Sequence, residues 1–212
     1  MTKKDRAKEI GIVFDKVYAD AKCSLDYTTE HELLVATMLS AQCTDARVNL
    51  VTPSLFESYN SVEDFANADV KEVEGYIHSC GFYHNKAKNI VQSARQIITR
   101  HGGRLPDTIE ELTSLAGVGR KTANLILGDI FSKPSVVVDT HCIRLSNRLG
   151  LTTEKDPVKI EMALKKILEP ASSGRFCHQL VYHGRAVCTA KNPKCNICPV
   201  KHLCKTGIKI EE

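Results

Sequence analysis

Apolar residues recur every three or four positions along most of this chain, which is the period of an amphipathic helix. The first segment has this period at Ala7, Ile10, Val13, Phe14, Val17, Tyr18 and Ala21. The stretch 86–100 has it at Ala87, Ile90, Val91, Ala94, Ile97 and Ile98. Gly102 follows this stretch as a helix stop signal. Only residues 135–138 resemble a strand, and one isolated strand cannot form a sheet. The sequence therefore predicts an all-α fold.

Helix start signals divide the chain into many short helices. Most of them pair a Ser, Thr or Asp cap with an acidic residue three positions later. These pairs are Thr29 with Glu32, Ser61 with Asp64, Asp69 with Glu72, and Thr108 with Glu111. A further helix is predicted after Asp156, because Pro157 then occupies the favoured first helical position.

The length and composition indicate a globular chain with its own core. The 212 residues are 42% apolar and suffice for one large domain or two small ones. No apolar run approaches the roughly 18 residues that a membrane-spanning helix needs. The first residues are polar and carry no apolar export segment. We therefore expect neither export nor a membrane anchor.

Positive charge is concentrated at the end of the chain. Residues 170–210 contain seven Lys or Arg and no acidic residue, whereas residues 1–169 contain 22 Lys or Arg and 23 Asp or Glu. Such a one-sided basic region is typical of a protein that binds a polyanion, because neutralised phosphates release counterions. On charge alone, a solvated basic tail is an equally good interpretation.

Four of the nine cysteines are clustered and predict a metal site. Cys188, Cys195, Cys198 and Cys204 are separated by six, two and five residues. Four thiolates suit either structural zinc or an iron-sulfur cluster. The spacing is neither that of a zinc ribbon nor that of a compact ferredoxin, and it favours a [4Fe-4S] cluster only slightly. We expect the scattered cysteines to be small core residues: Cys23, Cys43, Cys80, Cys142 and Cys177.

Residues 115–123 predict two helices joined by a tight Gly-X-Gly turn. Gly117 and Gly119 allow the backbone to turn sharply and to approach a neighbour closely. The unpaired N–H groups at the start of the second helix would then face outward and bind a phosphate. A plain helix-helix turn is the alternative. The adjacent Arg120 and Lys121 favour phosphate binding.

Lys121 and Asp139 are the candidate catalytic residues. Lys121 falls in the first turn of its helix, where the dipole and the neighbouring Arg120 disfavour a positive charge and so favour a nucleophilic amine. The alternative role of Lys121 is a phosphate ligand. Asp139 follows the apolar run 136–138 and is expected to cap the next helix. A functional role would have Asp139 face Lys121 across a cleft, where it accepts a proton or stabilises a sugar cation.

Together these motifs resemble the endonuclease III family of helix-hairpin-helix DNA repair glycosylases. The matching segments, in chain order, are Leu39-Ser40-Ala41-Gln42, Gly81-Phe82-Tyr83 with Asn85-Lys86-Ala87, residues 115–123, Val138-Asp139-Thr140-His141 with Asn147-Arg148-Leu149-Gly150, and the four clustered cysteines with Pro193 and Pro199. The resemblance implies a six-helix domain over residues 23–133 that contains the helix-hairpin-helix. It also implies an iron-sulfur cluster domain of residues 1–22 and 134–212, with a DNA cleft between the two domains.

The resemblance further implies a bifunctional DNA glycosylase and AP lyase. Its substrate would be duplex DNA with oxidised or ring-saturated pyrimidines, or with abasic sites. Lys121 would form a Schiff base and cut the strand by β-elimination, assisted by Asp139. Gln42 and Phe82 would fill the space that the flipped nucleotide leaves. We expect a monomer that acts on nucleoid DNA in a prokaryotic cytoplasm.

The resemblance also assigns the clustered cysteines. The resemblance implies that a [4Fe-4S] cluster is held by Cys188, Cys195, Cys198 and Cys204. The cluster would fix a loop whose Lys191 and Lys194 contact the DNA backbone.

Several positions depart from the family or lack a clear role. Ala116 stands where proline is frequent, and Phe82 stands where leucine is common, so hairpin stiffness and lesion preference are expected to differ. Asp45 and His141 match polar positions near the pocket without an assigned catalytic role. Lys86 is expected to be a phosphate contact or a solvated charge.

Two competing functions are a monofunctional mismatch glycosylase and a DNA-binding module with structural zinc. Monofunctional relatives lack a lysine at the nucleophile position, so Lys121 argues against the first.

Overall fold

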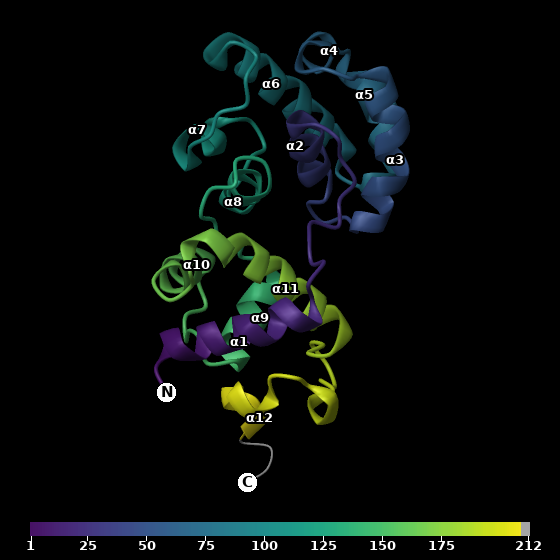
Figure 1. The fold of residues 1–212 in the computed structure, drawn as a ribbon. Helices are drawn as coiled ribbons and strands as arrows, with labels where there is room; N and C mark the ends of the chain where they lie inside the picture. Colours follow the sequence, from purple (N-terminus) through teal and green to yellow (C-terminus); the bar gives the residue numbers. More distant parts are fainter. Residues whose placement is uncertain (209–212) are drawn as a thin grey trace. The chain divides into compact units, whose positions relative to one another are not determined.

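The computed structural model describes residues 1–208, and all regular secondary structure in this range is helical (Figure 1). Residues 135–138 form no regular secondary structure. The all-α prediction is therefore confirmed. The chain divides into two compact units. We call Cys23–Phe131 the middle unit, and Met1–Lys22 together with the chain from Ser132 onward the terminal unit.

The middle unit is a set of α-helices with one short 3-10 helix. The elements are α2 (Glu30–Leu39), α3 (Asp45–Ser58), α4 (Val62–Asn67), α5 (Val70–Ile77), η1 (His78–Cys80), α6 (Tyr83–His101), α7 (Ile109–Ser114) and α8 (Arg120–Asp129). The long helix α6 packs against α4 and α5. Within residues 23–131 there are seven α-helices, where the resemblance implied six. Separate caps at Ser61 and Asp69 divide residues 62–77 into α4 and α5.

Side-chain caps begin these helices where the sequence predicts them. Thr29 caps α2 and forms a reciprocal capping box with Glu32, and Ser61 caps α4 in the same way with Asp64. Asp69 departs from this pattern, because its carboxylate accepts the N–H groups of both Lys71 and Glu72. Each such cap contributes about 1 kcal/mol to stability.

The terminal unit joins the first helix to the last third of the chain (Figure 1). Its elements are α1 (Lys3–Val17), α9 (Thr140–Arg148), α10 (Pro157–Lys165), η2 (Pro170–Ser172), α11 (Ser173–Ala186), η3 (Cys195–Ile197), η4 (Lys201–Leu203) and α12 (Lys205–Ile208). Asp156 caps α10, and Pro157 begins it as predicted. No helix in residues 1–208 has the length and apolarity that a membrane crossing requires.

Helix α1 supplies part of the core of the terminal unit. Ile10 and Phe14 are fully buried, and the Phe14 ring lies 6.0 Å from the ring of Phe176 in α11. The apolar period continues to Val17 in the sequence, yet Val17 is 50% exposed. The helix ends at this residue, and Tyr18 takes the C-cap position. The N-terminal helix is therefore held by residues more than 150 positions away in the sequence.

Candidate functional site

The segment between α7 and α8 is a tight hairpin, as predicted. The Val118 N–H donates to the Leu115 carbonyl at 3.2 Å, and the Ala116 N–H donates to Gln96 Oε1 of α6 at 2.7 Å. Gly117 has φ 73°, and a Cβ added there would lie 2.8 Å from the Cβ of Asn89. Gly117 is therefore required both by its backbone conformation and by its close packing against α6.

Gly119 differs from Gly117, because nothing in the protein demands a glycine there. It is the exposed N-cap of α8, with φ −90° and no side-chain cap. A Cβ added to Gly119 would meet no atom within 4 Å. The first N–H groups of α8 therefore lack a side-chain cap and can receive an anion such as a phosphate.

Lys121 is exposed in the first turn of α8, directly beside this helix start. Its ammonium lies within electrostatic range of the half-buried Cys23. Burial raises the pKa of the Cys23 thiol to about 11; the Asp129 and Asp45 carboxylates also raise it, and the Lys121 ammonium lowers it. Cys23 and Asp129, which lie near the two ends of the middle unit, thus share one electrostatic environment with Lys121. Sequence reasoning missed Cys23 and Asp129, since no local signal marks them.

Gln42 and Phe82 are brought together in the middle unit. Both side chains are exposed, and they line one hollow of about 240 Å³ together with Gly117. Gln42 has φ 55° and Phe82 has φ 49°. These left-handed conformations are strained for residues other than glycine. Three of the predicted DNA-binding residues therefore lie around one hollow.

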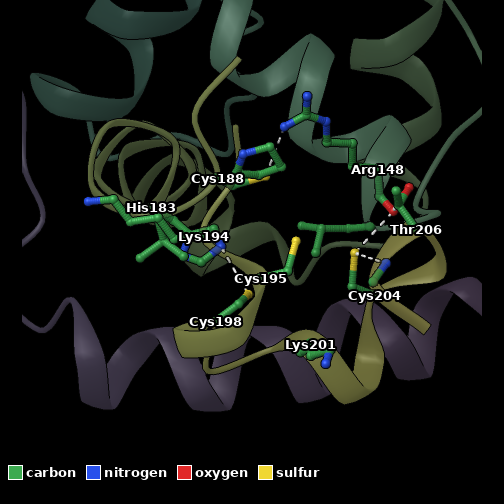
Figure 2. A pocket seen from close by; sticks show the side chains of 13 residues that line it. Arg148, His183, Cys188, Lys194, Cys195, Cys198, Lys201, Cys204 and Thr206 are labelled. Atoms are coloured by element: carbon green, nitrogen blue, oxygen red, sulfur yellow. Dashed lines mark hydrogen bonds between the residues drawn. The ribbon is translucent and has the colours of Figure 1, made fainter. Parts of the chain in front are cut away.

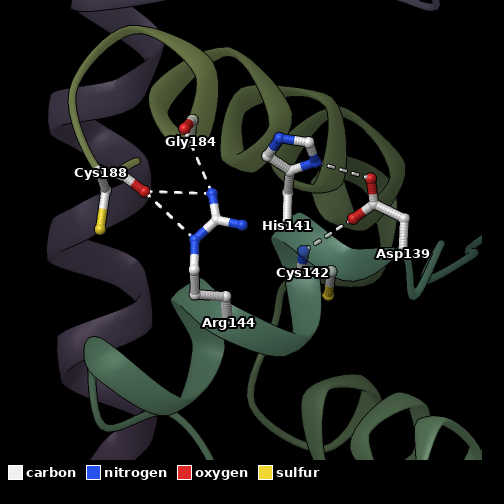
Figure 3. A network of polar contacts seen from close by, with 6 residues as sticks. All are labelled: Asp139, His141, Cys142, Arg144, Gly184 and Cys188. Carbon is white, nitrogen blue, oxygen red and sulfur yellow. Dashed lines mark hydrogen bonds and ion pairs between the residues drawn. The ribbon is translucent and has the colours of Figure 1, made fainter. Parts of the chain in front are cut away.

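Asp139 is the N-cap of α9 and has a second contact (Figure 3). Its Oδ1 accepts the Cys142 N–H at 2.7 Å, and its Oδ2 lies 3.2 Å from His141 Nδ1. The two side chains are only 20% and 23% exposed. The capping role is thus present, and His141 holds the other oxygen. Because Lys121 belongs to the middle unit and Asp139 to the terminal unit, their pairing stays a prediction.

Helix α11 packs closely against α9 at His141, the residue that contacts this carboxylate. A Cβ added to Gly184 would lie 2.6 Å from His141 Cδ2 and 2.9 Å from Arg144 Nη2. Arg144 donates to the carbonyls of Gly184 at 3.2 Å and Cys188 at 3.1 Å (Figure 3). Sequence reasoning missed Arg144 and Gly184. A glycine inside a helix marks such a close approach, but no helix was predicted around Gly184.

The four clustered cysteines line one cavity of about 130 Å³ in the terminal unit (Figure 2). Polar groups lie within hydrogen-bond distance of three of the four sulfurs. Arg148 donates to Cys188 Sγ at 3.4 Å, the Gly207 N–H donates to Cys204 Sγ at 3.3 Å, and His183 Nε2 lies 3.6 Å from Cys198 Sγ. Such contacts stabilise anionic thiolates and tune a cluster.

Four thiolates that line one cavity suit either a structural zinc ion or an iron-sulfur cluster.

The remaining cysteines are only partly core residues. Cys80, Cys142 and Cys177 are buried, as predicted, whereas Cys23 and Cys43 are half-buried. Burial and the neighbouring Cys43 thiol raise the pKa of Cys80 to about 11.

The loop between Cys188 and Cys195 presents two lysines. Lys191 and Lys194 are exposed. Arg148 holds the start of this loop, because it donates to the carbonyls of Thr189 at 2.8 Å and Ala190 at 2.9 Å. The resemblance implies that the cluster ties this loop, which stays a prediction, and both lysine side chains are exposed where a polyanion could reach them.

Lys86 departs from the sequence interpretation. It was expected as a phosphate contact or a solvated charge, yet it is only 7% exposed. Its Nζ donates to the carbonyls of Leu39 at 2.8 Å and Cys80 at 3.0 Å. Both expectations are wrong, because tertiary packing covers the start of α6.

Known proteins share this arrangement. Residues 35–170 match the HhH-GPD superfamily of base excision DNA repair proteins, and residues 188–204 match the iron-sulfur binding domain of endonuclease III. Endonuclease III from Synechocystis sp. is 50% identical over 97% of this chain and 94% of its own length. Endonuclease III from Bacillus subtilis is 41% identical over 95% of this chain and 94% of its own length. A solved structure of a trapped endonuclease III-DNA covalent intermediate, an estranged-adenine complex, is 38% identical with a TM-score of 0.92, over 100% of both chains.

These matches decide between the alternatives that the sequence left open. The iron-sulfur match identifies the cofactor as a [4Fe-4S] cluster, in agreement with the cysteine-lined cavity, and the zinc interpretation is wrong. The family resemblance drawn from the motifs is confirmed. The chain belongs to the endonuclease III family within the HhH-GPD superfamily of base excision DNA repair proteins.

Proposed function

We propose that this chain is a bifunctional DNA glycosylase and AP lyase of base excision repair, with Lys121 as its nucleophile. Its substrates are oxidised or ring-saturated pyrimidines in duplex DNA. The observation that carries the proposal is an exposed lysine in the first turn of α8, beside a helix start that has no side-chain cap. The similarity to a trapped endonuclease III-DNA covalent intermediate supports it.

The DNA contacts follow from the hairpin, the hollow and the cysteine loop. The N–H groups at Gly119 and the start of α8 receive a backbone phosphate, and Gly117 shapes the turn that presents them. Gln42 and Phe82 insert where the damaged nucleotide leaves the stack. Lys191 and Lys194 meet a further part of the phosphate backbone.

The chemistry follows from an amine and a carboxylate. The Lys121 amine attacks C1′ of the deoxyribose, the glycosidic bond breaks, and the base leaves with the bonding electrons. Asp139 accepts the proton from Lys121 or stabilises the positive charge on the sugar. The C1′–O4′ bond then breaks and O4′ takes up a proton, which opens the sugar ring and leaves an imine between C1′ and the Lys121 nitrogen. The imine acidifies the C2′ proton, whose loss expels the 3′ phosphate oxygen and cuts the strand. His141 keeps Asp139 oriented through its contact with Oδ2.

The [4Fe-4S] cluster has a structural role in this account. Cys188, Cys195, Cys198 and Cys204 are its ligands, since their sulfurs line one cavity. When bound, it supplies four iron-thiolate bonds that fix the loop carrying Lys191 and Lys194. We place the enzyme, as a monomer, on nucleoid DNA in the bacterial cytoplasm, where its substrate lies.

A single-turnover assay tests the proposal. Cluster-loaded protein is mixed with duplex DNA that contains one thymine glycol, and released base and cut strand are measured separately. We expect both products, and neither from undamaged duplex. Base release that leaves an uncut abasic site would indicate a monofunctional glycosylase, and binding without either product would indicate a DNA-binding module.

A further inference from the structure

A buried ammonium links two separate parts of the middle unit. Lys86 lies in the first turn of α6, and its side chain is covered by protein. Its Nζ donates one hydrogen bond to the Leu39 carbonyl at 2.8 Å and another to the Cys80 carbonyl at 3.0 Å. A charge is rarely buried unless it is hydrogen-bonded in this way. One side chain therefore joins two segments that are 41 positions apart in the sequence.

The two carbonyls lie at the bases of the loops that carry Gln42 and Phe82. Leu39 is the last residue of α2, three positions before Gln42. Cys80 is the last residue of η1, two positions before Phe82. Carbonyls at helix ends lack partners within the helix, and a cation is the group that such an end attracts. Lys86 thus satisfies both helix ends at the points where the two loops leave them.

Both loops need such an anchor. Gln42 and Phe82 have φ 55° and 49°, and such strained conformations persist only where surrounding contacts fix them. The backbone N–H of Lys86 also donates to the Phe82 carbonyl at 3.1 Å. Lys86 therefore holds the Phe82 loop at two points and the Gln42 loop at one.

A second contact joins the same two loops. The thiols of Cys43 and Cys80 are close enough that Cys43 raises the pKa of Cys80, and Gln42 and Phe82 line one hollow. The two loops are distant in the sequence, yet they lie side by side and Lys86 holds both of them.

We propose that Lys86 is a positioning residue that makes Gln42 and Phe82 enter the DNA as one unit. This inference rests on the proposed function, in which these two side chains hold the opened base step. Holding an intact base pair open requires both side chains at once. With only one of them inserted, the opposite strand can return and the base pair can form again. A lesion that is already unpaired needs no such wedge. The contribution of Lys86 should therefore depend on whether the damaged base is paired.

The test compares two DNA substrates with Lys86→Met and a matched control. One duplex has thymine glycol opposite adenine, and the other has it inside a short unpaired bubble. We expect Lys86→Met to slow single-turnover base release roughly 10- to 100-fold on the paired lesion and less than about twofold on the bubble. Lys88→Met removes an exposed lysine of the same helix and should leave the ratio of the two rates unchanged. A merely structural loss would slow both substrates alike. An unchanged ratio in Lys86→Met overturns the proposal.

Hydrogen exchange provides a readout that needs no catalysis. In the free, cluster-loaded protein, amides of residues 40–43 and 80–83 should exchange faster in Lys86→Met, and in both loops together. Lys86→Gln is a smaller change that keeps a hydrogen-bond donor, and it should speed exchange in both loops to a lesser degree. It replaces Lys86→Met if that variant does not fold. Unchanged exchange, or a change confined to one loop, contradicts the link. Absence of base release by the unmodified protein would refute the proposed function, whereas the exchange result would still decide the role of Lys86.

Discussion

Gly117 and Gly119 stand two positions apart in one hairpin, yet the fold requires glycine only at the first. A side chain at Gly117 would be strained by φ 73° and would collide with Asn89. Gly119 has an ordinary backbone conformation and open space around it. We infer that the requirement at Gly119 comes from a phosphate that approaches the start of α8.

This difference gives the first prediction. Gly119→Ala should lower the free energy of unfolding by about 1 kcal/mol, because alanine is a poorer N-cap than glycine. It should also weaken duplex binding about tenfold, a loss of roughly 1.4 kcal/mol. Gly117→Ala should destabilise the protein by about 1–3 kcal/mol. Thermal unfolding and fluorescence anisotropy with lesion DNA measure the two effects. Equal DNA affinity in Gly119→Ala and the unmodified protein would show that no phosphate binds at this position.

Asp139 combines a capping role with the proposed catalytic one, and Asp139→Asn separates them. Asparagine caps helices as well as aspartate does, so α9 and the stability should be retained. Base release should fall roughly 10²- to 10⁴-fold, since the amide can neither accept the proton nor stabilise the cation. Single-turnover kinetics together with an unfolding curve check this result. An unaltered rate would leave Asp139 with the capping role alone.

Lys86 shows why some residues of the site were not predictable. Its position at the start of α6, after Asn85 and two residues before Lys88, is typical of a solvated charge. Only tertiary packing brings the carbonyls of Leu39 and Cys80 around it. The hairpin glycines and the cap at Asp139 were predictable, because the signals that mark them lie within a few residues in the sequence.

At the scale of elements, the start of a helix is predicted accurately where a side chain caps it and less accurately where none does. Helices with side-chain caps begin where the sequence indicates, as at Thr29 and Ser61. Helix α6 begins at Tyr83, three residues before the predicted start, because its N-cap Phe82 makes no side-chain hydrogen bond. The glycine stop at Gly102 ends α6 with φ 60°, as expected.

The cysteine loop allows a prediction about salt. Replacing both Lys191 and Lys194 by alanine removes two phosphate contacts, so the slope of log affinity against log salt should become shallower by about 1.8. The exposed Lys155 and Lys159, changed together in the same way, provide the charge-matched control outside the loop. Binding of duplex DNA across a salt series measures both slopes. If the loop variant keeps the original slope, the loop does not touch the backbone.

At the scale of the whole molecule, the terminal unit depends on contact between the two ends of the chain. Periodicity predicts α1 as an amphipathic helix but cannot say which surface covers it. The partner is α11, and the Phe14 ring lies 5.0 Å from the His183 ring beside Cys198. The division into units came from the family resemblance and not from the local pattern, since the terminal unit is discontinuous in sequence.

Phe14→Ala tests this long-range dependence. Loss of a fully buried ring should lower the free energy of unfolding by about 3–5 kcal/mol. It should also speed the loss of the visible absorbance of the cluster, because the Phe14 ring packs against His183, whose Nε2 contacts the Cys198 sulfur. Val17→Ala, at a half-exposed position of the same helix, should change neither property. A cluster that persists equally long in both variants would show that α1 does not support the cysteine cavity.

The central claim is that Lys121 is the group that becomes covalently joined to the deoxyribose. Borohydride reduction of the protein with thymine glycol DNA, followed by mass mapping of the joined peptide, tests this claim directly. We predict one reduced adduct, located on Lys121, that is absent from Lys121→Ala and retained in Lys88→Ala. An adduct of equal yield in Lys121→Ala, or one that maps to a different amine, would contradict the account.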